Sequence, residues 1–149
     1  METEQQSWES LAKLLREQRL CVLATQDTRG PYASLVAFGH TDDLHTLLFS
    51  TSRQTHKYAN LSAASQVAIL IDDSRNVEED FHGATAVTAI GRATLVAKDD
   101  LVRFRDLFLA KHPGLAVFLR APTCALIRVD VERYYIVTRF QSVVELKVT

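Results

Sequence analysis

Cysteine, proline and glycine are scarce in this chain of 149 residues, which has two, three and five of them. Two cysteines cannot form the dense disulfide framework of a small secreted domain. Cys21 and Cys124 each lie in an apolar stretch typical of a strand, so we expect buried, reduced thiols, with a disulfide or a metal pair as the alternative. Repeats, low-complexity segments and Pro/Ser linkers are also missing, which predicts a single domain over residues 1–149.

An excess of charge of either sign is absent too, because 17 Lys and Arg stand against 18 Asp and Glu. A nucleic-acid-binding domain normally carries a clear basic excess, so we expect no nucleic acid as partner. No apolar run approaches the roughly 20 residues that cross a bilayer, and the acidic start of the chain is unlike a signal peptide. These absences predict no membrane partner and a cytoplasmic location.

Apolar and alternating stretches joined by short turns dominate what is present, and they are typical of antiparallel strands. Such a meander with few, short helices favours a mainly β fold, a closed antiparallel barrel of six or seven strands with peripheral helices. The expected strands cover residues 20–27, 31–40, 44–51, 66–72, 83–97, 124–140 (as one strand or two) and 143–148. The inner face of the fifth is expected to carry Val87, Ala89, Gly91, Ala93 and Leu95.

Several local expectations accompany this pattern. A first helix is expected to be capped by Ser7, and a third to begin after Asp99 or Asp100. The strand 66–72 is apolar enough to be buried on both faces. The polar stretch 73–83 is expected to be a surface loop.

Hydroxyl and basic residues gather where the third expected strand meets a short second helix, over about residues 55–64. Hydroxyls and backbone N–H groups at a helix start, beside a cation, can seat a phosphate. Lys57 would be the point charge, and Ser50, Thr51 and Thr55 the hydrogen-bond donors. The alternative is an ordinary N-cap followed by a solvated helical turn. The sequence has no G-x-x-x-x-G-K-[ST] motif, which excludes a P-loop.

Other constellations are weaker. No nucleophile motif is present, and the five histidines are too scattered to predict a metal site. Two runs mix cations with aromatic rings, which could stack on a planar ligand or lie at a barrel edge or subunit contact. The histidines are His40, His45, His56, His82 and His112, and the two runs are Arg133-Tyr134-Tyr135 and Arg139-Phe140.

Three segments in this order, VLATQDTRGPYASLVAF, LLFSTSRQTHKYANLSAASQVAIL and AVTAIGRATLV, resemble the flavin-binding split-barrel family that includes pyridoxamine 5′-phosphate oxidase. The resemblance covers residues 20–97 well and the C-terminal third loosely. It implies a six-stranded split barrel, a homodimer, and FMN in a cleft between the subunits. The backbone of Ser34, Leu35 and Val36 would lie along the isoalloxazine. The FMN phosphate would meet Ser50, Thr51, Thr55, His56 and Lys57.

The chain also departs from the family pattern. Ser34 and Gly39 stand where the oxidase has an arginine and a lysine, His56 where an arginine assists the phosphate, and Ala86 where a glutamine contacts the flavin. The oxidase's C-terminal substrate-binding arginine and histidine have no counterpart after Phe140. We therefore expect an FMN-dependent oxidoreductase of unknown substrate, and not a true pyridoxamine phosphate oxidase.

Two other classes of function stay open at this point. The protein could store, sense or buffer a flavin without catalysis. It could also be a haem- or deazaflavin-binding relative, although no histidine follows His112 to serve as a C-terminal haem ligand. The residues name no catalytic acid or base.

Overall fold

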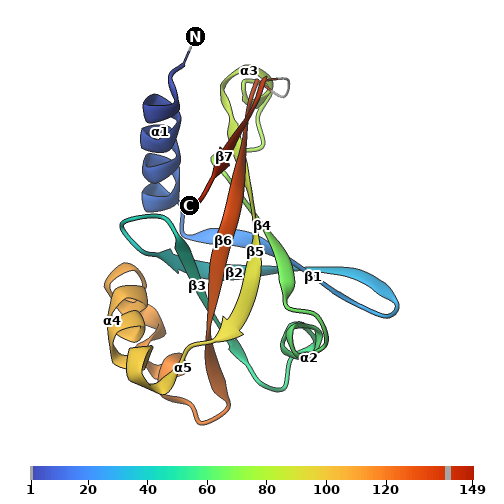
Figure 1. Ribbon diagram of the computed structural model, residues 1–149, viewed down its shortest axis with the longest axis vertical. Coiled ribbons are helices and arrows are strands. Elements are labelled where there is room, and N and C mark those ends of the chain that lie inside the picture. Colours follow the sequence, from blue (N-terminus) through green and yellow to red (C-terminus); the bar gives the residue numbers. More distant parts are fainter. Residues whose placement is uncertain (1, 140–141) are drawn as a thin grey trace.

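Six strands close into an antiparallel barrel in the computed structural model, which describes residues 2–139 and 142–149 (Figure 1). The order in the sheet is β3-β2-β1-β4-β5-β6-β7, and β3 also pairs with β6, so β7 is an extension on β6. The strands are β1 (Leu20–Asp27), β2 (Gly30–His40), β3 (Thr46–Ser52), β4 (Gln66–Asp72), β5 (Thr85–Leu95), β6 (Cys124–Thr138) and β7 (Ser142–Lys147). The mainly β barrel predicted from the sequence is confirmed, and the residues after Cys124 form one long strand.

The helices lie around the barrel, and none of those in the described residues is long and apolar enough to cross a membrane. A long helix, α1, runs beside β7, whereas α4 and α5 lie together at the opposite end (Figure 1). They are α1 (Glu4–Glu17), α2 (His56–Ala63), α3 (Asp80–Gly83), α4 (Leu101–Lys111) and α5 (Ala116–Arg120), with single 3-10 turns at Lys98–Asp100 and Pro113–Leu115.

Helix α1 begins earlier than predicted. Thr3, not Ser7, is its N-cap: the Thr3 hydroxyl accepts from the backbone N–H of Gln6 at 3.1 Å, and the Thr3 N–H donates to the Gln6 side chain at 2.8 Å. This reciprocal capping box satisfies two groups that a cap at Ser7 would leave unpaired. Ser7 is instead buried inside the helix.

Three further local predictions were wrong in part. Strand β4 is buried on one face, and Leu70 on its other face is 42% exposed. The predicted loop 73–83 ends in the short helix α3. On β5 the buried face ends at Ala93, and Leu95 is half exposed because the strand finishes there.

Two apolar clusters hold the fold. The larger one fills the barrel and includes Leu11 and Leu15 of α1, which closes one side. The smaller one lies under α4, where Phe104 and Phe108 pack on Leu48 of β3. The ring of buried His112 ties this cluster to β2, because its Nε2 lies 2.7 Å from the Phe38 carbonyl oxygen. A buried carbonyl needs such a partner.

Strands β5 and β6 pack tightly around Gly91, where no side chain would fit. The register shifts between Ile90 and Gly91, so Glu132 is an extra residue on β6. A Cβ on Gly91 would collide with the Asp130 carbonyl group and come within 3.0 Å of Val129 Cγ1. The bulge and the glycine together allow the barrel to bend here.

We expect Gly91→Ala to lower the free energy of unfolding by about 1–3 kcal/mol, because the added methyl meets backbone that cannot rotate away. Urea denaturation measures this change. Gly114→Ala is the control, since nothing lies within 4 Å of the Cβ it would add. Equal stability of the two variants would contradict the tight crossing.

Candidate functional site

The junction between β3 and α2 is built around two threonine hydroxyls. Thr55 is the N-cap of α2: its Oγ1 accepts from the backbone N–H of Tyr58 at 3.3 Å and donates to the Ser52 carbonyl at 2.9 Å. The hydroxyl of Thr51 lies 2.9 Å from that of Thr55, and Thr51 is 1% exposed. Both hydroxyls are therefore engaged within the junction, and they hold the turn that leads into the helix.

A buried amide fixes α2 to the barrel. Asn60 Nδ2 donates to Thr25 Oγ1 of β1 at 3.0 Å, and both residues are almost fully buried. The first turn of α2 contains no acidic residue. The positive end of the helix dipole is thus held in place without a carboxylate from its own first turn to balance it.

Three cations surround this helix start, and two of them are held by neighbours. The guanidinium of Arg53 donates to the Tyr58 hydroxyl at 3.2 Å and lies over its ring, 5.8 Å from the centroid. His56 Nε2 lies 3.3 Å from Asp27 Oδ2, and its ring stacks on Tyr32 with 4.5 Å between centroids. Lys57 is half-buried, as is Ser50 at the end of β3.

Asp27 turns His56 toward the hairpin between β1 and β2. The backbone N–H of Arg29, 2.7 Å away, and then the hydrogen bond with His56 hold the pKa of Asp27 below its usual value. The carboxylate therefore stays charged beside the imidazole. Arg53 and His56 are thus held by neighbouring side chains, and Lys57 is the remaining basic residue predicted to bind the phosphate.

The three predicted residues of β2 do not face the same way. Ser34 and Val36 point inward, whereas Leu35 points outward and is 67% exposed. The Ser34 hydroxyl is buried without a hydrogen-bond partner among the described residues. A buried hydroxyl without a partner is costly, and this one lies on a strand where the sequence predicts contact with a ligand.

Leu35 belongs to an apolar patch on the outer face of the barrel. Val22 of β1 pairs with Leu35 on one side and Leu70 of β4 on the other, so their side chains share this face. Leu20, 53% exposed, lies two residues before Val22 on the same face. We call Leu20, Val22, Leu35 and Leu70 the outer patch. Exposed apolar patches of this kind mark interaction surfaces.

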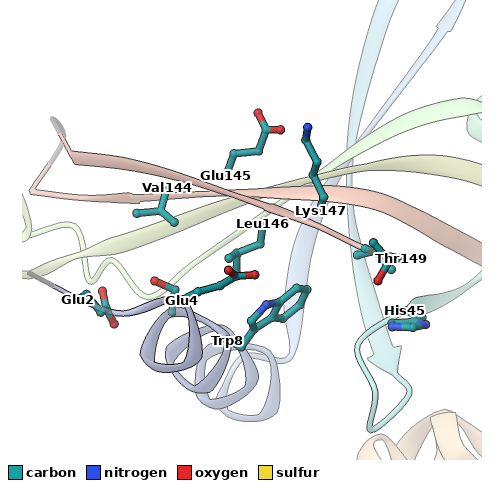
Figure 2. Close-up of a pocket in the computed structure, with 11 residues that line it drawn as sticks. Glu2, Glu4, Trp8, His45, Val144, Glu145, Leu146, Lys147 and Thr149 are labelled. Atoms are coloured by element: carbon teal, nitrogen blue, oxygen red, sulfur yellow. The ribbon is translucent and has the colours of Figure 1, made fainter.

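A large cavity, of about 660 Å³, lies elsewhere, between α1, β7 and His45 (Figure 2). Trp8 and Leu146 point toward each other across it, whereas Glu145 and Lys147 point to the other side of β7. Glu2 and Glu4 also line it, and acidic side chains repel a phosphate. None of the predicted site residues lines this cavity.

Sequence reasoning missed Asp27 and Tyr32, which hold His56 although they lie 29 and 24 positions earlier in the chain. It noted the basic character of Arg53 but did not include it in the site. Arg139 is exposed in a turn at φ 52°, and Phe140 lies outside the described residues.

Within residues 2–139 and 142–149, no group of three or more His, Cys, Asp or Glu side chains is placed to hold a metal ion. Cys21 and Cys124 are both free, and Cys124 is only half-buried.

Comparison with protein families matches residues 7–138 to the family described as pyridoxamine 5′-phosphate oxidase. No curated protein matches the sequence significantly. Among solved structures, the chain is similar to a haem-binding protein from Mycobacterium smegmatis, with a TM-score of 0.80 and 20% identity over 91% of this chain and 57% of that one. The chain thus spans less than two thirds of that relative.

Two shorter relatives match over most of their own length. A FAD-binding protein from Mesorhizobium loti has a TM-score of 0.68 and 14% identity, covering 86% of this chain and 91% of that one. The haem storage protein of Vibrio cholerae has a TM-score of 0.68 and 17% identity, covering 87% and 92%. At these identities the likeness shows the fold alone.

We expect Thr55→Ala to lower the free energy of unfolding by about 1 kcal/mol, because α2 loses its cap and Thr51 loses its partner. Thr55→Ser keeps the hydroxyl and should stay close to the parent protein. Thermal or urea unfolding of the three proteins measures the difference, and an alanine variant as stable as the serine one would contradict the cap.

Proposed function

Because the chain belongs to the pyridoxamine 5′-phosphate oxidase family of split barrels, we propose that it binds FMN and works as a flavin-dependent oxidoreductase. The observation that carries this proposal is the start of α2, where cations gather and the first turn holds no acid. A dianionic phosphate complements such a helix start.

The residues of the junction would have different roles in binding the FMN phosphate. Lys57 would contribute the point charge, and Ser50 a hydroxyl donor at the end of β3. Thr51 and Thr55 would act indirectly: their hydroxyls bond to each other and so fix the turn that positions the other residues. Asp27 would compete with the phosphate for His56, which makes His56 a weaker phosphate partner than the arginine usual in the family.

The flavin, when bound, would supply the hydride or electron transfer. The chain would bind it, orient it and exclude water on the side that the barrel covers. The two free cysteines agree with work in a reducing compartment such as the cytoplasm.

A second copy of the chain would complete the cleft. The outer patch includes Leu35 of β2, the strand along which the flavin is expected to lie. Covering this patch with the same patch of another copy would form an isologous dimer. The flavin would then lie where the two copies meet.

Haem is the second candidate, because two of the similar structures are of a haem-binding and a haem storage protein. The histidines give it less support. His112 is buried on the Phe38 carbonyl, and His56 is held by Asp27. A haem complex would show a Soret band, and a flavin complex would not.

We expect Lys57→Ala to weaken FMN binding about 10- to 100-fold, the worth of one charge-assisted hydrogen bond. Riboflavin, which lacks the phosphate, should bind the parent and the variant equally, and the melting temperature of the apo-protein should hardly change. Fluorescence titration measures both affinities, with Lys13→Ala on α1 as control. Unchanged FMN affinity in Lys57→Ala would remove Lys57 from the site.

Leu35→Glu should convert the dimer to a monomer and weaken FMN binding, because it places a charge in the centre of the outer patch. Val102→Glu on α4 is the matched control, since both parent side chains are 67% exposed. Analytical ultracentrifugation gives the assembly state of each protein. A parent chain that binds FMN as a monomer would contradict the shared cleft.

A further inference from the structure

A groove on the outer face of the barrel, separate from the β3–α2 junction, ends at Arg133. It has a volume of about 340 Å³ and is lined by residues of β1, β2, β4, β5 and β6. In the register of these strands Ala24 pairs with Ala68, Ala68 with Ile90, and Ile90 with Arg133. The four side chains therefore form one row across the outer face. Gln26, Pro31 and Gln66 also line the groove.

Arg133 lacks a hydrogen-bond acceptor for its Nε, which is buried and unpaired among the described residues. Its nearest acidic neighbour in sequence, Glu132, is the extra residue of the bulge and pairs with Arg92 at 3.5 Å. On the other side Arg133 faces a second cation, Lys147 of β7. Like charges directly opposite each other destabilise a sheet, so an anion beside them would relieve both costs.

The chemistry of the row favours one class of anion. A guanidinium binds a carboxylate through two parallel hydrogen bonds in one plane, and the unpaired Nε of Arg133, which is buried, would form one of them once the side chain turns toward the groove. The two alanines and Ile90 offer a shallow apolar floor, which suits a flat ring. Cζ of Arg133 also lies 5.9 Å from the ring centroid of Tyr135, which limits where the guanidinium can turn.

We propose that this groove binds a planar carboxylate, with Arg133 holding the acid group and Ala24, Ala68 and Ile90 supporting the ring. Lys147 adds positive potential at the same end. The groove adjoins the outer patch, because Ala24 and Ala68 lie two residues along β1 and β4 from Val22 and Leu70, and the variants below separate its occupant from the flavin. An aromatic or heteroaromatic acid is the class of small molecule that this surface selects.

The test uses benzoate as probe on the full chain without FMN, followed by ¹H–¹⁵N NMR. We expect saturable shifts at the amides of Ala24, Ala68 and Ile90. Arg133→Gln should weaken binding at least about tenfold, and Arg133→Lys should fall between the two because it keeps the charge without the planar fork. Arg92→Gln is the matched control: it removes a cation of the same face that Glu132 already neutralises, so benzoate affinity should hold.

Three results would each overturn the proposal. They are an equal loss of affinity in Arg92→Gln and Arg133→Gln, binding of benzamide or inorganic phosphate as tight as that of benzoate, and shifts located elsewhere or absent. FMN affinity is measured on the same variants. If Arg133→Gln weakens FMN as much as benzoate, Arg133 belongs to the flavin seat and the separate groove is wrong. If FMN fails to bind the parent while benzoate behaves as expected, the proposed cofactor fails and the groove stands.

Discussion

The pairing of β3 with β6 turns an open sheet into a barrel, and the position of the candidate site depends on it. The pairing runs from Thr46 opposite Asp130 to Ser52 opposite Cys124, so the end of β3 is fixed beside the start of β6. The chain then turns, through the Thr51–Thr55 hydroxyl pair, into α2, which packs against the barrel core. A hydrogen bond from Asn60 ties that helix to Thr25 of β1. The junction is therefore rigid, which a site needs if it is to hold a ligand without paying ordering entropy at binding.

Closure of the barrel also determines which side chains remain on its outer face. In a barrel the inward side chains fill the core, and the strands alternate between core and surface except where a helix covers the outer face, as at β3, or a bulge interrupts the strand, as in β6. Val36 and Ile69 are used for packing, while Leu35 and Leu70 remain outside and form the outer patch. Arg133 and Tyr134 divide in the same way, since Tyr134 is fully buried with its hydroxyl on the Leu44 carbonyl at 2.7 Å. Sites on this protein are thus expected on the outer face and at the strand ends, and not inside the barrel.

Much of this could be predicted from residue patterns within short windows. The bounds of β1 and β4 match the predicted strands, and the cap of α2 at Thr55 lies where the second helix was expected to begin. Errors arose where contacts outside the local sequence window determine the structure. Ser7 is a good cap by type, but the reciprocal hydrogen bonds of Thr3 and Gln6 form the cap instead, and Leu70 of β4 is 42% exposed on the outer face. The Asp27–His56 contact and the unpaired Arg133 depend on strand registers, which no local pattern contains.

The account's central claim is that the junction at the start of α2 seats the phosphate of a flavin. The visible absorption spectrum of the freshly purified protein, before and after addition of FMN, tests it most directly. The account predicts a flavin double band that stays with the protein through gel filtration, or appears on it when FMN is added. A Soret band from copurified haem, or a colourless protein that leaves added FMN entirely free, would contradict it.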